Sequence, residues 1–346
     1  MRTQPETIIK RLEADNSRLA KEGIIAEAME EGLPEFFQGV TWCLDKLHTF
    51  GVKQVPTKET DDGQGLPWDA FCQLADQLAK RKLTGHAARD AILLQMEAAT
   101  QTQWNDWYRR ILIKDLRCGV SEKTVNNVAK RLKRPEYRVP VFECQLAQDS
   151  TKHESKMKGE KIVQQKLDGV RALCVVDYEK RNVSLFSRNG KELTNFPHVC
   201  DAILNDIDQF GRSYVIDGEI MSNDFQTLMT QVHRKENVQS KDAHFNVFDI
   251  IPLFEFKQGK STMGQKNRSN FLNTQFKNVL EETGCCTVVP WEIINLDTKE
   301  GQDKLKQINA DTIAAGFEGI IIKDPRAPYE CKRTSSWLKL KPFIEV

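Results

Sequence analysis

The chain has 346 residues, which at roughly 100–200 residues per domain favours two domains. Apolar residues make up 40% and charged residues 29%, and 50 basic against 49 acidic residues leave a formal charge of +1. This profile excludes a disordered chain, and any nucleic-acid surface must come from local clusters of cations. No apolar run reaches the ~20 residues of a membrane helix. Nine cysteines without metal-type spacing predict free thiols in a reducing cytoplasm.

The first part of the chain has the pattern of helices. Apolar residues recur at spacings of three and four among charged residues, as in amphipathic helices. This pattern predicts helices within residues 6–32, 36–51, 68–83, 85–101, 103–116 and 122–134, and a turn-rich loop over 55–67. Residues 1–140 are therefore expected to form an all-α domain.

After about residue 140 the pattern changes to short runs rich in Val, Ile and aromatic residues, which is typical of strands. Strands are predicted within residues 161–167, 171–178, 182–188, 214–221, 244–251, 287–294, 318–323 and 336–341. Helices are predicted within 198–210, 269–284 and 299–316, and residues 148–161 are interpreted as a solvated connector. The fold class expected for the whole chain is α+β.

The segment Lys166-Leu-Asp-Gly-Val-Arg171 is the strongest functional signal. Its Asp168-Gly169 dipeptide predicts a tight turn that holds Lys166 and Arg171 at one end of a hairpin-like unit. A lysine acts as a nucleophile only after its amine loses a proton, which desolvation or a nearby cation promotes. Arg171 supplies such a cation and is also suited to gripping a phosphate.

Further segments place charged or aromatic residues at the ends of apolar strands or within them. They hold Arg188, Glu219, Phe248, Glu318, Lys323, Lys339 and Lys341. Glu219 lies in an apolar strand, where an unpaired buried carboxylate is costly. Lys339 and Lys341 alternate along a strand and so face the same side. Core packing remains the alternative for Phe248, and a solvated surface the alternative for Lys323 and Lys341.

This ordered set resembles the motifs of ATP-dependent DNA ligases, and among these the phage enzymes of the T-even and T7 type. The superfamily of covalent nucleotidyltransferases also includes RNA ligases and capping enzymes. The resemblance implies an α+β nucleotidyltransferase domain with ATP-grasp-like antiparallel sheets over residues 141–346. It also implies a polynucleotide ligase that seals 3′-OH/5′-phosphate nicks in duplex DNA. Lys166 would take AMP from ATP, AMP would pass to the 5′-phosphate, and the 3′-OH would displace it.

The resemblance also implies roles for the other residues. Arg171 and Arg188 would contact the sugar and phosphate of the nucleotide, with Leu167 beside the nucleophile. Phe248 would stack on adenine, and Lys323, Lys339 and Lys341 would neutralise the α-phosphate. Glu219 would bind the ribose or a metal, and Glu318 would bind Mg²⁺, which prefers oxygen ligands. Gln164 stands where many family members have a glutamate that reads adenine, and its amide is also able to contact a base edge.

Two segments of the first part, residues 79–88 and 115–124, place cations before a glycine turn and a helix start. Backbone N–H groups at such a start bind phosphate, and Ser121 or Thr84 is suited to capping the helix. Both segments resemble the helical DNA-binding domain of larger ATP-dependent DNA ligases. This implies a DNA-binding domain over 1–140, with contacts from Lys80, Arg81, Lys82, Thr84, Gly85, Arg117, Gly119, Ser121, Lys123 and Thr124. Capped surface helices without a ligand are the alternative.

The partners implied are ATP, Mg²⁺ and nicked double-stranded DNA, with no membrane, and a monomer suffices. The expected setting is the cytoplasm, that of the host if a phage encodes the chain, in replication, repair and recombination. Family members continue into an OB-fold domain after the last motif. The sequence ends five residues after Lys341, so we expect that domain to be absent from this chain. An RNA ligase, a capping guanylyltransferase or a nick-binding module without turnover are the alternatives.

Overall fold

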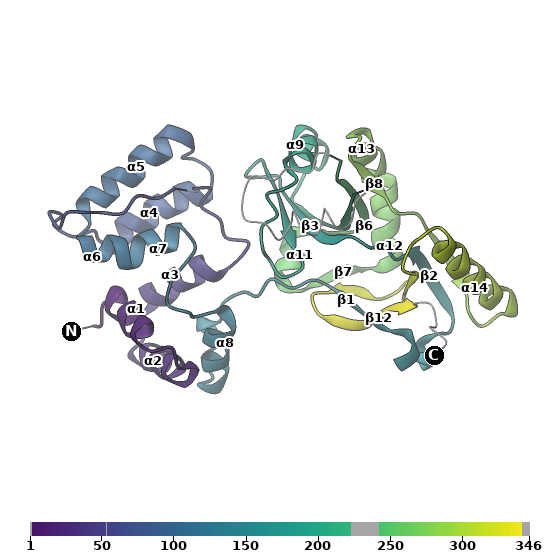
Figure 1. Ribbon diagram of the computed structural model, residues 1–346, viewed down its shortest axis with the longest axis horizontal. Helices are drawn as coiled ribbons and strands as arrows, with labels where there is room; N and C mark the ends of the chain where they lie inside the picture. The colour runs from purple at the N-terminus through teal and green to yellow at the C-terminus, as the bar shows by residue number, and fades with distance from the viewer. Residues whose placement is uncertain (1, 53, 223–241, 341–346) are drawn as a thin grey trace. The chain divides into compact units, whose positions relative to one another are not determined.

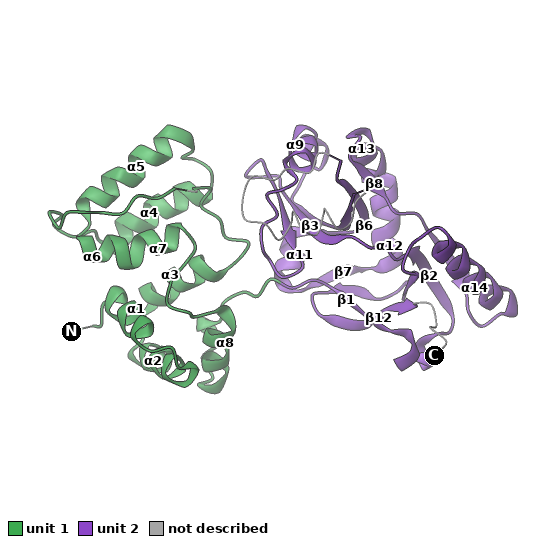
Figure 2. Cartoon of the chain, in the orientation of Figure 1, with its two compact units in different colours: residues 1–142 green, residues 143–346 purple. Residues whose placement is uncertain are grey.

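The computed structural model describes residues 2–52, 54–222 and 242–340. The chain divides into two compact units, residues 1–142 and 143–346 (Figure 2). The first is helical and the second is rich in sheet (Figure 1), so the predicted α+β class is confirmed. Among the described helices, none is long and apolar enough to cross a membrane.

The helices of the first unit follow the predicted order. They are α1 (Pro5–Ala14), α2 (Arg18–Glu31), α3 (Pro34–Leu44), α4 (Trp68–Ala79), α5 (Gly85–Ala98), α6 (Gln101–Gln103), the π-helical segment Trp104–Tyr108, α7 (Arg109–Leu112) and α8 (Glu122–Arg131). The stretch predicted over 6–32 is two helices, because Ser17 caps α2 by accepting a hydrogen bond from the Ala20 amide. The core contains several aromatic side chains, and Phe36 stacks on Trp107 at 5.5 Å between ring centroids.

The second unit contains two five-stranded sheets and a two-stranded ribbon among its described residues (Figure 1). Sheet A has the order β1 (Leu146–Asp149), β12 (Arg333–Leu340), β10 (Ile320–Lys323), β2 (Glu160–Gln165), β9 (Trp291–Asn295). Sheet B has the order β4 (Asn182–Ser187), β3 (Val170–Asp177), β5 (Tyr214–Met221), β6 (His244–Pro252), β8 (Cys286–Val288). The ribbon pairs β11 (Pro328–Glu330) with β7 (Lys260–Gly264). Pairing is antiparallel except for β1 with β12 and β6 with β8, which lie at sheet edges.

Helices flank both sheets. They are α9 (Pro197–Asn205), α11 (Leu253–Gln258), α12 (Gln265–Phe271), a π-helical segment (Leu272–Phe276), α13 (Lys277–Glu282) and α14 (Lys299–Ala314). Leu305 of α14 packs on Val163 and Ile322 of sheet A, and α9 and α13 close the larger core of sheet B. Arg171, Asp217 and Glu219 lie on the face of sheet B opposite the core that α9 and α13 close.

Two sequence expectations for this unit are wrong. Residues 287–294 do not form one strand, because Pro290 separates β8 of sheet B from β9 of sheet A. The segment after Lys166 is not a hairpin, since β2 and β3 belong to different sheets. The 148–161 connector contains short 3₁₀ turns after β1, a strand that the sequence did not predict.

Candidate active site

A cavity of about 280 Å³ lies between the inner faces of the two sheets. It is lined by all the described residues of the predicted nucleotide set, which come from separate segments: Gln164, Lys166, Leu167, Arg171, Arg188, Glu219, Phe248, Lys323 and Lys339. Leu146, Arg333 and Trp337 also line it. Lys341 lies outside the described residues. Strand register explains part of the grouping, because Gln164 and Lys339 both lie opposite Ile321 of β10.

Lys166 lies in the link from β2 to β3, where the chain passes between the sheets. Its backbone amide donates to the carbonyl of Gly319 at 2.8 Å. Its ammonium forms an ion pair with Glu318, just before β10. Glu318 is not part of the cavity lining but contacts the predicted nucleophile directly. The two residues, 152 positions apart in sequence, thus share one site.

Two glycines allow close backbone approaches beside this link. A Cβ on Gly169 would lie 2.3 Å from the Ile220 carbonyl oxygen, and one on Gly218 would lie 2.4 Å from that of Asn246. Gly218 lies at a β-bulge, where β6 has one residue more than β5 and Phe248 is the extra residue. Bulges re-aim side chains beside functional sites, and here Phe248 faces the cavity rather than the core.

Glu219 lies in β5 beside the same link. Its carboxylate accepts a hydrogen bond from the Gly169 amide at 3.2 Å. Burial raises the pKa of Glu219 to about 7, although Arg171 and the Gly169 amide act in the opposite direction. Because this pKa is near neutral pH, small changes in the surrounding charge determine whether the carboxyl group is ionised.

Arg171 is held in place by hydrogen bonds that the sequence did not indicate. Its guanidinium makes two hydrogen bonds to the Asp217 carboxylate, at 2.6 and 2.7 Å, and a third to the Gln145 carbonyl at 3.1 Å. It also lies 4.9 Å from the centroid of the Phe248 ring. Arg171 thus lines the cavity with three of its five guanidinium N–H donors engaged. The sequence analysis had given Asp217 no role.

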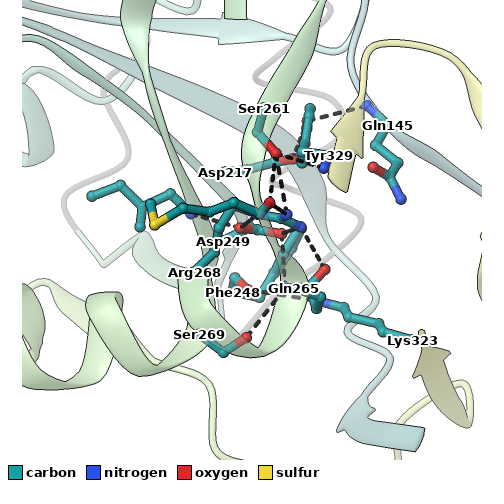
Figure 3. Close-up of polar contacts among 12 residues, drawn as sticks. Gln145, Asp217, Phe248, Asp249, Ser261, Gln265, Arg268, Ser269, Lys323 and Tyr329 are labelled. Atoms are coloured by element: carbon teal, nitrogen blue, oxygen red, sulfur yellow. Dashed lines mark hydrogen bonds and ion pairs between the residues drawn. The ribbon is translucent and has the colours of Figure 1, made fainter. Parts of the chain in front are cut away.

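A buried polar network lies behind the cavity (Figure 3). Arg268 of α12 donates to both carboxylate oxygens of Asp249, at 2.8 and 3.1 Å, and Gln265 donates to the same group. Tyr329 donates to Asp217 at 2.6 Å, so the ribbon strand β11 also supports the site. Burial alone would raise the pKa of Asp249, but the Arg268 charge brings it below its usual value.

Sequence analysis had assigned no role to these network residues. Asp249, in the apolar strand after Phe248, carried a usable signal, since a buried carboxylate needs a partner. Arg268, Gln265 and Tyr329 carried none, because their roles depend on partners far away in sequence.

Gln164 lies in β2 at the wall of the cavity. Its side-chain amide donates to the Val289 carbonyl at 3.1 Å. Its Oε1 atom is buried and has no hydrogen-bond partner among the described residues. A buried acceptor without a donor is uncommon and identifies a place where a ligand donor would be stabilised.

The carboxylates of Glu219 and Glu318 lie at or beside the cavity and are candidate metal ligands. Among the described residues, no group of three or more His, Cys, Asp or Glu side chains could hold a metal ion. Glu318 and Glu219 remain, and Mg²⁺ is commonly held by one or two carboxylates together with substrate phosphates. The residues present therefore fit Mg²⁺ that binds with a nucleotide, and do not form a site made of protein ligands alone.

A larger hollow of about 1300 Å³ lies elsewhere in the second unit and contains none of the predicted site residues. Its lining combines cations such as Lys156, Lys266 and Arg326 with acids such as Asp324 and Glu330. The smaller cavity is the better candidate, because the groups able to do chemistry converge there.

The two segments predicted to bind DNA lie at helix starts in the first unit. Ser121 caps α8 by accepting from the Thr124 amide at 3.4 Å, whereas Thr84 precedes α5 without making a side-chain cap. Gly85 and Gly119 have φ angles of +55° and +66°, so glycine is favoured at both turns. Lys82, Arg117 and Lys123 are exposed, and Lys80 pairs with Asp76 in the last turn of α4. Arg81 is partly buried against Gly51.

A groove of about 880 Å³ brings parts of these segments together. Gly85 and Arg117 both line it, although they are far apart in sequence. Arg89 of α5 and Arg109 of α7 line it as well, and neither was predicted from the sequence as a DNA-binding residue. The other predicted residues are not part of this lining: Lys80, Arg81, Lys82, Thr84, Gly119, Ser121, Lys123 and Thr124.

Comparisons with known proteins agree with this site. The pattern of the ATP dependent DNA ligase domain matches residues 144–341, more than half of the chain. The chain therefore belongs to the family of ATP-dependent DNA ligase domains. A solved structure described as Pmar-Lig_Pre is similar over 99% of this chain and 79% of its own, with 48% identity and a TM-score of 0.61.

Curated relatives are more distant. The DNA ligase of Methanothrix thermoacetophila is 24% identical over 201 residues, covering 54% of this chain and 33% of the relative. DNA ligase 4 of Pongo abelii is 27% identical over 300 residues, covering 72% of this chain and 31% of the relative. The second match covers more of the chain than residues 143–346, so the likeness reaches into the helical unit. The chain spans about a third of the length of the curated relatives it matches.

Proposed function

We propose that this chain is the nucleotide- and DNA-binding part of an ATP-dependent DNA ligase that seals 3′-OH/5′-phosphate nicks in duplex DNA. The observation that carries the proposal is the single cavity in which Lys166 meets every described residue of the predicted nucleotide set. Family membership supports it. Nick sealing completes replication, repair and recombination alike, and one copy acting in the cytoplasm, or in the host of a phage, is sufficient.

The first step is nucleotidyl transfer to Lys166. Its ammonium must lose a proton, after which Nζ attacks the α-phosphorus of ATP, and the bond to the pyrophosphate oxygen breaks. Glu318 is the carboxylate in contact with this ammonium. Lys323 and Lys339 line the same cavity and are suited to balancing the charge that builds on the α-phosphate. AMP then passes to the 5′-phosphate of the nick, and the 3′-OH displaces it.

Mg²⁺ is the metal that the carboxylates fit best, and we assign Glu318 and Glu219 to it. When bound, it polarises phosphate oxygens as a Lewis acid. Arg188, which directly follows β4, is suited to contacting the nucleotide or nick phosphate. Arg171 would keep its pair with Asp217 and contribute a fixed positive charge.

Gln164 supports ATP as the nucleotide. Adenine presents an amino group at the position where guanine presents a carbonyl oxygen. The unpartnered Oε1 of Gln164 accepts from an amino group and repels a carbonyl. This favours a ligase that uses ATP over a capping guanylyltransferase.

Nicked duplex DNA is the partner we propose for the helical unit. The groove lined by Gly85, Arg89, Arg109 and Arg117 offers cations and a helix start to a phosphate backbone. Contacts of this kind hold a duplex without reading its sequence, as nick sealing requires.

A sealing assay tests the function. The chain is incubated with ATP, Mg²⁺ and a duplex that carries one labelled 5′-phosphate at a nick. We expect sealed strands, and none from the Lys166→Ala variant. A nick that is already adenylated bypasses the transfer of AMP to Lys166 and its transfer to the 5′-phosphate, so wild type should seal it without ATP. Failure of wild type on both substrates, despite tight binding to the nick, would favour a binding module without turnover.

A further inference from the structure

Lys323 is a buried cation without an ion-pair partner of its own. It is 2% exposed, and among the described residues it takes part in none of the ion pairs. The carboxylates that act on its charge, Asp217 and Asp249, are each already paired with an arginine. Within the described ranges, its one hydrogen bond is a long one of 3.4 Å to the Phe248 carbonyl. Asp249 and Asp217 favour the charged form of Lys323, but because each already neutralises an arginine, a further group is needed to offset the cost of burying this charge.

Two aromatic rings surround this ammonium. The Nζ atom lies 4.3 Å from the centroid of the Trp337 ring and 5.2 Å from that of Phe248. Trp337 is directly opposite Lys323 in the pairing of β10 with β12. The indole N–H donates to Gln265 at 2.8 Å, which fixes the orientation of the ring. Trp337 is itself buried and meets Phe248 edge to face, with centroids 6.0 Å apart.

An aromatic face stabilises an ammonium without neutralising it, whereas a carboxylate neutralises it. A ring attracts a cation through its quadrupole but carries no net charge. An ammonium held by rings therefore keeps its full charge for an incoming anion, whereas an ion pair would already be neutral. A nucleotide phosphate then has no competing carboxylate to displace.

We infer that Trp337 is a positioning residue for nucleotide binding: its indole face holds the Lys323 ammonium in the cavity as an uncompensated cation, ready for a phosphate. This rests on the proposed function. It adds a residue that neither the motif reasoning nor the family likeness assigned.

The charges around Lys323 are consistent with this role. Burial lowers the pKa of Lys323 to about 8, while Asp249 and Asp217 raise it and Arg268 and Arg171 lower it. The ammonium form still prevails at neutral pH. Loss of the indole face removes one stabiliser of the charged form, so the pKa of Lys323 should fall further.

The test compares Trp337→Leu with Trp337→Phe, which loses the indole N–H but keeps an aromatic face. ATP affinity is measured by calorimetry from pH 6.5 to 9 in the Lys166→Ala background, where no transfer can occur. We expect Trp337→Leu to bind ATP about tenfold more weakly at pH 8 and to lose affinity about one pH unit earlier. Trp337→Phe should stay within about threefold of its parent across the range.

A second measurement needs no nucleotide. The Lys323 amine is titrated by NMR in protein labelled with [ε-¹³C]lysine, with its resonance assigned through Lys323→Arg. We expect a lower pKa in Trp337→Leu than in Trp337→Phe, and Trp337→Met supplies the comparison if the leucine variant does not fold. Equal titration in the two variants, or equal loss of ATP affinity, would overturn the inference. Absence of ATP binding by the parent would instead count against the proposed function.

Discussion

The buried ammonium of the single residue Lys323 supplies positive charge to the cavity and lowers the stability of the folded chain. Because burial lowers the pKa of Lys323 to about 8, the folded chain holds this proton less tightly than the unfolded chain does. Between pH 8 and the ordinary lysine value the unfolded state binds more protons, so the free energy of unfolding rises with pH in that window. Below pH 8 the full cost of the buried ammonium is present.

Replacing Lys323 with methionine removes this cost at nearly constant shape. We expect Lys323→Met to raise the free energy of unfolding at pH 7 by about 1–3 kcal/mol, and to flatten its rise above pH 8. Urea denaturation at pH 7 and pH 9.5 measures both effects. If the variant is less stable than wild type at pH 7, the attraction between the ammonium and the aromatic faces exceeds the free-energy cost of burying the ammonium.

Gln164 is the residue on which nucleotide choice should depend. We expect Gln164→Met, which keeps the volume but loses the unpartnered acceptor, to reduce the preference for ATP over GTP by about tenfold. Competition binding in the Lys166→Ala background measures the ratio. An unchanged ratio would assign base selection to backbone groups of the cavity.

At the scale of elements, the pair between Arg268 and Asp249 fastens α12 to β6. Both side chains are fully buried. Truncating one partner leaves an uncompensated charge, so we expect Arg268→Met to lower the free energy of unfolding by about 3–5 kcal/mol. Chemical denaturation provides the measurement.

The exposed pair between Arg181 and Asp208 offers a matched control in the same unit. Arg181→Met should leave the free energy of unfolding nearly unchanged, because solvent screens an exposed pair. Similar losses in the two variants would mean that solvent screens the inner pair as well.

Helices and strands were predicted well where the local residue pattern determines them. They were predicted less well where a strand forms only by pairing with a partner that is distant in sequence. The Val, Ile and aromatic residues of 214–221 and 244–251 were enough to predict β5 and β6, whereas β7 and β11 are short and depend on each other. Asp168-Gly169 indicated a turn, but no local signal tells whether the flanking strands share a sheet. The sequence analysis gave Trp337 no role, because that role depends on contacts with Lys323 and Gln265 that only the fold creates.

At the scale of the whole molecule, the helical unit should supply much of the affinity for DNA. Each phosphate contact contributes about 0.9 to the slope of log affinity against log salt. We expect the double variant Arg89→Ala/Arg117→Ala to reduce that slope by about 2 on a nicked duplex, with little dependence on sequence. Fluorescence anisotropy over a range of salt concentrations measures it.

Lys304 and Lys306 lie on α14 of the other unit and provide the control. Their replacement by alanine removes the same number of cations away from the groove. An equal change of slope in both double variants would mean that the effect follows net charge and not the groove lined by Gly85 and Arg117.

The intact mass of the purified chain, before and after incubation with Mg²⁺ and ATP, GTP or NAD, tests the central claim most directly. A gain of one AMP with ATP alone, absent from the Lys166→Ala variant, is the predicted result. It would establish the reaction, the nucleophile and the nucleotide together. A GMP adduct, or an AMP adduct that persists in Lys166→Ala, would contradict the account.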